Sequence, residues 1–175
     1  MSSKWSTDRI VSISAIVVSL STLLVIIYQT HLMGKAQRAA VMPYLEVRLS
    51  LRGDRQVIMV NNTGIGPAMI KEVRIITPDS TFVGEPFAFA KKLVDVSIDF
   101  DWYSTDLVLP GRLIIASQSI SAFSHSVVGN RGNFISDTFR FPYDPQGWAV
   151  IEVTYASIYG DQWVSRSDQL TPESR

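Results

Sequence analysis

The feature that most constrains this chain is an uncharged apolar run near its N-terminus. From Ile10 to Tyr28 the sequence reads IVSISAIVVSLSTLLVIIY, nineteen residues without a charged side chain. A helix of that length extends about 29 Å, close to the roughly 30 Å thickness of the hydrocarbon core of a bilayer. The run therefore predicts a transmembrane helix over residues 10–30, preceded by an N-terminal tail over residues 1–9.

Aromatic residues flank this run on both sides. Trp5 precedes it and Tyr28 ends it, and amphipathic rings are typical of the membrane–water interface. We expect both residues to anchor the helix at the interfaces. The alternative is a cleaved signal peptide, whose apolar region is usually about 7–15 residues long and precedes a small-residue cleavage site. The longer run and the Gln37-Arg38 pair beyond it favour an uncleaved anchor.

Small and hydroxylated residues recur along the run. Ser12, Ala15, Ser19 and Thr22 are spaced by three, four and three residues, which places them on one helical face. Such a face predicts helix packing in the membrane, against a second copy or a membrane-protein partner. In the alternative interpretation the hydroxyl groups bond back to carbonyls of their own helix and have no functional role.

Basic residues on the two sides of the run are nearly balanced. Lys4 and Arg9 precede it, and Lys35, Arg38 and Arg48 follow it. The positive-inside rule compares these counts. Charge alone therefore gives no orientation in the membrane.

The residue pattern changes beyond the apolar run. Residues 31–42 keep a helical spacing, and Pro43 disfavours helix in the residue before it, so a juxtamembrane helix extension is predicted to end at Met42. Alternation of apolar and polar residues then predicts strands near residues 45–51, 56–60, 69–76, 94–102, 107–109, 113–116, 119–127, 149–155 and 163–164. Short helices are expected near residues 87–93 and 134–139. These elements predict an antiparallel, immunoglobulin-like β-sandwich over residues 43–167, followed by a flexible tail over residues 168–175.

Composition narrows the classes of function. The chain holds 16 Lys and Arg against 16 Asp and Glu, which argues against general nucleic-acid binding, because that requires a surplus of basic residues. It has no cysteine, so disulfides, thiolate metal sites and a cysteine nucleophile are excluded. We expect no cofactor and no metal.

Histidine is scarce, with His31 next to the apolar run and His125 in a serine-rich stretch. A hydrolase would need His125 as the base, with Ser124 as nucleophile and Asp137 as orienting group. Ser124 and His125 are adjacent, so on a strand their side chains would point to opposite faces. The GxSxG and HExxH motifs are both missing from the sequence. We therefore expect no enzymatic activity.

Three aspartates lie on one face of the predicted strand at residues 94–102. Asp95, Asp99 and Asp101 would point the same way, as carboxylates that bind Ca²⁺ do. Neighbouring same-face positions on one strand are about 7 Å apart, too far for these three alone to enclose an ion. A solvated edge strand is the favoured interpretation.

The segment NNTGIGPA at residues 61–68 is the most distinctive loop. Asn61, Asn62, Gly64 and Gly66 are candidate ligand-binding residues, because closely spaced glycines can present successive backbone N–H groups to an anion. The surrounding sequence lacks the context of a dinucleotide site or a P-loop. The favoured alternative is a structural loop that needs positive φ at a glycine and a rigid stop at Pro67.

Taken in order, these features resemble those of a family of small bacterial proteins with one transmembrane helix and a β domain. The matching motifs are MPYLEV at residues 42–47, N-x-G-x-G-P-A at 62–68 followed by Ile70, and Y-x-S-I-Y-G at 155–160. The resemblance covers about residues 10–164. It implies a protein of the inner membrane with a cytoplasmic β domain, and it implies no particular activity.

Two hypotheses for function follow from the sequence. The first is a membrane-anchored interaction module, such as an accessory subunit of an inner-membrane complex, with the bilayer and either a membrane protein or a second copy as partners. The alternative is a membrane-tethered sensor that binds a small ligand or anion through the loop from Gly64 to Pro67.

Overall fold

The computed structural model describes residues 7–93, 102–103, 106–126 and 133–175. The chain forms two compact units, Met1–Ala40 and Val41–Arg175; the second is called the β domain below. The predicted interfacial residue Trp5 lies outside the described residues. So do the three aspartates of the predicted strand at residues 94–102.

The first unit contains helix α1, Thr7–Ala40. By length and composition α1 is apolar enough to cross a membrane. The predicted transmembrane and juxtamembrane segments are therefore one continuous helix. It ends two residues before Met42, because the main chain at Met42 bonds to the β domain instead, accepting a hydrogen bond from the N–H of Ile65.

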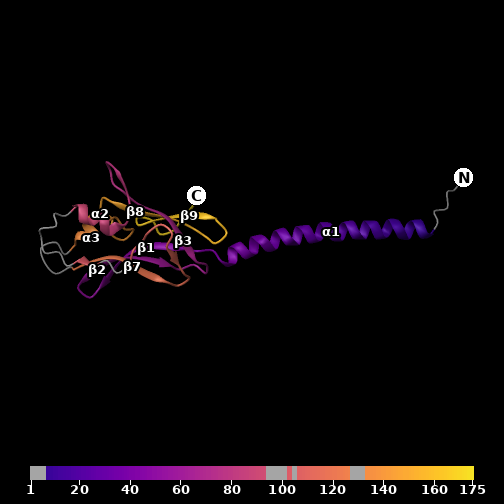
Figure 1. Ribbon diagram of the computed structural model, residues 1–175, viewed down its shortest axis with the longest axis horizontal. Helices are drawn as coiled ribbons and strands as arrows, with labels where there is room; N and C mark the ends of the chain where they lie inside the picture. Colours follow the sequence, from indigo (N-terminus) through magenta and orange to yellow (C-terminus); the bar gives the residue numbers. More distant parts are fainter. Residues whose placement is uncertain (1–6, 94–101, 104–105, 127–132) are drawn as a thin grey trace. The chain divides into compact units, whose positions relative to one another are not determined.

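The β domain is an antiparallel sandwich of two sheets (Figure 1). The first sheet has the order β1-β2-β7-β5, with bounds Leu45–Arg52, Arg55–Asn62, Ser119–Ser126 and Trp102–Tyr103. The second has the order β10-β9-β8-β3-β4, with bounds Glu173–Ser174, Gln162–Arg166, Val150–Ala156, Ala68–Ile76 and Thr81–Val83, and β6 (Leu113–Ile114) also pairs with β3. The short helices are α2 (Pro86–Leu93) and α3 (Phe134–Thr138).

Alternation along the strands produces the core. In β1 the side chains of Leu45 and Val47 are buried, whereas Arg48 is exposed. The inward faces of both sheets, together with α2 and α3, form one hydrophobic cluster. The predicted helix followed by an antiparallel β-sandwich is confirmed, and the immunoglobulin-like assignment stays a prediction.

Two local predictions were wrong. Residues 107–109 form a loop and not a strand, because Arg112 donates to the Leu107 carbonyl at 2.8 Å and pairs with Asp106 at 2.9 Å. Residues 168–175 are not a flexible tail, since β10 pairs with β9 and the N–H of Arg175 donates to the Gln162 carbonyl. Because main-chain hydrogen bonds hold this segment in place, its polar side chains did not indicate in the sequence that it is ordered.

Candidate functional site

The loop at residues 61–68 is organised by the buried side chain of Asn62, which is 1% exposed. Its Oδ1 accepts from the N–H of Tyr44 at 3.2 Å and of Gly64 at 3.0 Å. Its Nδ2 donates to the carbonyls of Gly66 at 2.8 Å and Ile114 at 3.0 Å. One amide group thus ties the start of β1, its own loop and β6 together.

The backbone N–H groups of the predicted anion nest already have acceptors within the protein. Thr63 donates to the Tyr44 carbonyl, and both Ile65 and Gly66 donate to the Met42 carbonyl, at 2.9, 3.1 and 3.3 Å. Since the Gly64 N–H donates to Asn62, the loop turns its amide donors inward. This geometry supports the structural interpretation of the loop.

Close packing, not backbone conformation, explains the two glycines. Among the glycines that the structure describes, positive φ occurs at four others but at neither Gly64 nor Gly66, so the expected positive φ was wrong here. A Cβ on Gly66 would overlap the carbonyl of Val41, and one on Gly64 would overlap the N–H of Tyr44. The loop therefore lies directly against the segment that follows α1.

The other candidate residue of this loop, Asn61, has a smaller role. It is partly exposed, and its Oδ1 accepts from the hydroxyl of Ser119 on β7. That contact joins neighbouring strands of the first sheet and involves no other part of the loop.

The Y-x-S-I-Y-G motif at residues 155–160 holds the segment from Val41 to Leu45, called the entry segment below, from the opposite sheet. Tyr155 on β8 is fully buried, and its hydroxyl accepts from the N–H of Leu45 at 3.2 Å. Its ring stacks on Trp163 with centroids 5.8 Å apart. Burial raises the pKa of Tyr155 to about 12. The motifs at residues 62–68 and 155–160 thus both contact the entry segment. Because they are far apart in the sequence, this shared role could not be predicted from it.

Two hydroxyl groups of the predicted packing face on α1 bond within their own helix. Ser12 donates to the Asp8 carbonyl and Thr22 to the Val18 carbonyl, each at 2.8 Å. This is the pattern of the alternative interpretation. Packing of another helix on the face that includes Ala15 and Ser19 stays a prediction, as does an interfacial role for the exposed ring of Tyr28.

The residues weighed for hydrolysis lie in different surroundings. His125 is buried on β7, with its ring edge-on to Phe134 at 5.8 Å. Ser124 precedes it on the same strand, and Asp137 is exposed on α3. The expectation of no enzymatic activity stays a prediction.

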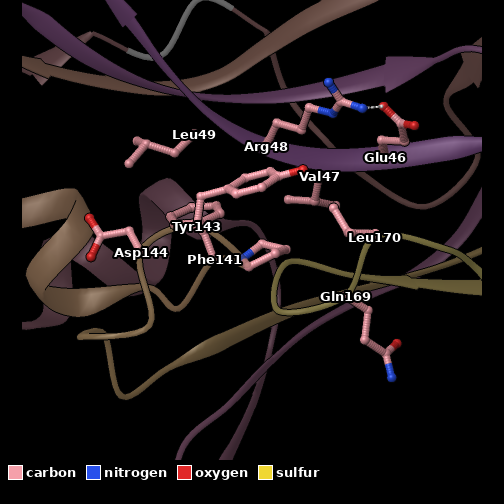
Figure 2. Close-up of a pocket in the computed structure, with 10 residues that line it drawn as sticks. Glu46, Val47, Arg48, Leu49, Phe141, Tyr143, Asp144, Gln169 and Leu170 are labelled. Carbon is pink, nitrogen blue, oxygen red and sulfur yellow. Dashed lines mark ion pairs between the residues drawn. The ribbon is translucent and has the colours of Figure 1, made fainter.

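A groove of about 230 Å³ lies along β1 (Figure 2). It is bordered by β1, by the loop before β8 and by the turn after β9. Its lining residues are Glu46, Val47, Arg48, Leu49, Phe141, Pro142, Tyr143, Asp144, Gln169 and Leu170. The Tyr143 side chain is 87% exposed and extends toward Val47 in Figure 2.

The groove follows the free edge of the first sheet. In the described part of the chain, β1 has β2 as its one strand neighbour. Main-chain groups in an antiparallel pair point alternately toward and away from the partner. The Tyr44 carbonyl accepts from Thr63 on the β2 side, whereas the Leu45 N–H donates away from β2. By the same alternation, Val47 and Leu49 direct their N–H and C=O groups into the groove.

Charged groups line the rim of the groove. Arg48 pairs with Glu46 at 2.6 Å on the outer face of β1 (Figure 2), and Asp144 lies at the other rim. Apolar side chains such as Phe141 and Leu170 form much of the remaining wall. The groove thus combines an apolar wall with main-chain donors and acceptors that pair with no other described residue, as a strand-binding site requires. Sequence alternation identified β1 but gave no indication that it is an edge strand.

No protein-family model, curated protein or solved structure matches this chain. The family resemblance described above therefore stays a prediction.

Proposed function

We propose that this protein is a membrane-anchored interaction module, an accessory subunit of a bacterial inner-membrane complex with its β domain in the cytoplasm. Two observations support the proposal. Helix α1 has the length and composition of a membrane span, and the β domain has its own core. The observation that carries the proposal is the groove on the free edge of β1.

The partner segment binds this groove as an added strand. Val47, Leu49 and Leu51 are two residues apart, so their outward main-chain groups recur about every 7 Å. An extended peptide backbone presents donors and acceptors at the same repeat. Its alternate side chains would contact Phe141 and Tyr143 across the groove.

The alternative sensor function has less support. Its proposed donors in the loop from Gly64 to Pro67 are engaged within the protein. An anion would have to displace the Met42 carbonyl from the N–H groups of Ile65 and Gly66. The interaction module requires no such rearrangement.

A proline at Leu49 tests the groove directly. Proline removes the outward N–H of Leu49 but leaves the β1–β2 hydrogen bonds intact, and edge strands tolerate it at such positions. We expect the full chain, purified from bacterial membranes in mild detergent, to carry a stoichiometric membrane-protein partner. The Leu49→Pro variant should lose that partner while its β domain still folds, with a melting temperature lowered only by the loss of the partly buried Leu49 side chain from the core.

Val83 on edge strand β4 provides the matched control. Gly84 donates to Val73 on β3, so the N–H of Val83 points away from β3 by the same alternation. Val83→Pro should keep the partner. Equal loss in both variants, or a wild-type chain that purifies alone and monomeric, would contradict the proposal.

A further inference from the structure

Three uncharged loops at one end of the β domain each expose an isoleucine. They are residues 63–67, 115–118 and 157–160, with the sequences TGIGP, IASQ and SIYG. Ile65, Ile115 and Ile158 in these loops are 74%, 58% and 59% exposed. Loops usually carry polar residues, because their side chains meet water, so three apolar tips need an explanation.

Hydrogen bonds and strand register place the three loops together. Asn62 links the first two, since its Nδ2 donates to the Ile114 carbonyl and its own carbonyl accepts from Ser117. The third loop follows Ala156, which pairs with Met69 at the start of β3. Met69 also pairs with Leu113 on β6. All three loops therefore surround the start of β3.

The surrounding surface is apolar as well. Further exposed side chains there are Met69, Leu113 and Tyr159. Other turns of the domain differ: the β1–β2 turn lies between Arg52 and Arg55, and the β3–β4 turn contains Asp79. The apolar surface, called the isoleucine end below, thus differs from these two charged turns.

The chain from α1 enters the β domain at the isoleucine end. Ile65 donates to the Met42 carbonyl, and Gly66 packs on Val41. Twelve helical residues, 29–40, separate Tyr28 from Val41, so Val41 lies at most about 20 Å beyond the end of the apolar run. The headgroup layer covers about 5–8 Å of that distance, and tilt of the helix shortens the remainder.

We propose that the isoleucine end docks on the bilayer surface, with Ile65, Ile115 and Ile158 inserted at the interface. Moving an isoleucine side chain from water into this boundary lowers the free energy, and the cost of dehydrating uncharged loops there is small. Because the three loops themselves carry no charged side chain, insertion of their isoleucines should occur on neutral as well as on anionic lipid. This inference rests on α1 being a membrane anchor and does not depend on the groove along β1.

Site-specific labelling tests the docking in the full-length protein. The chain has no cysteine, so Ile65→Cys, Ile115→Cys and Ile158→Cys each provide one site for an environment-sensitive fluorophore. The labelled proteins are reconstituted into phosphatidylcholine vesicles, with and without phosphatidylglycerol. We expect a blue-shifted emission at all three sites, and loss of intensity when nitroxide-labelled lipid is present.

Leu51 and Val83 provide matched controls, because they are 69% and 64% exposed and lie on strands away from the isoleucine end. Leu51→Cys and Val83→Cys labels should stay red-shifted and unquenched. Isoleucine-end labels that match these controls would overturn the proposal. A blue shift without lipid quenching would also overturn it, since that result indicates burial against protein.

Discussion

Replacing Asn62 with alanine tests whether one side chain holds the entry segment of the β domain. The substitution removes four hydrogen bonds, to Tyr44, Gly64, Gly66 and Ile114. Each contributes about 1 kcal/mol net, and more where a buried partner is left unsatisfied. We expect the free energy of unfolding to fall by about 3–4 kcal/mol. That is a large part of the stability of a typical domain.

The assay is equilibrium urea unfolding of residues 41–175, monitored by tryptophan fluorescence. Asn61→Ala is the matched control, because this neighbouring residue is partly exposed and loses one hydrogen bond, to Ser119. Its cost should be about 1 kcal/mol or less. If the two variants lost equal stability, the account of Asn62 as the centre of the loop would be refuted.

Three further predictions concern the same domain. Gly66→Ala should unfold or strongly destabilise it, because the new Cβ would overlap Val41, whereas Gly34→Ala on α1 has open space and should leave the thermal unfolding of the β domain unchanged. Tyr155 has an ordinary pKa of 10.0 when unfolded and about 12 when folded, so the unfolded state loses its proton first. Stability should fall by about 3 kcal/mol between pH 10 and 12, and Tyr155→Phe, followed by urea unfolding at several pH values, should lack that part of the decline. Deleting residues 171–175 removes β10 and should lower the urea midpoint modestly, by about 1–2 kcal/mol of stability; an unchanged midpoint would contradict an ordered C-terminus.

Periodic patterns of apolar residues predicted those helices and strands in which the backbone period alone decides which side chains are buried. Alternation in LEVRLSLR identified β1, and alternation near residues 56–60 identified β2, which pairs with β1 across the two-residue turn at residues 53–54. The long apolar run identified α1. In these segments the face of each side chain follows from the backbone period, so the sequence carries the information directly.

Contacts between segments that are far apart in the sequence could not be predicted from such patterns. The apolar residues at 107–109 suggested a strand, but the ion pair of Arg112 with Asp106 holds a loop there. β10 depends on main-chain bonding to β9, which leaves no pattern in its side chains. The spacing of the glycines likewise suggested an anion site, whereas the structure shows that position 66 needs a glycine because it packs directly on Val41.

The groove could be predicted least of all. Its walls come from β1, from the loop at residues 141–144 and from the turn at 169–170. These segments are far apart in sequence and carry no shared motif. Only the strand order shows that β1 lies at a sheet edge, and only the register shows which main-chain groups face outward.

Helix α1 is expected to remain on the mature protein as the membrane anchor of the β domain. Intact-mass measurement of the protein from bacterial membranes washed at alkaline pH tests it most directly. A retained anchor predicts a full-length species of 19.5 kDa in the washed membrane fraction. A shorter, released species that lacks α1 would contradict it.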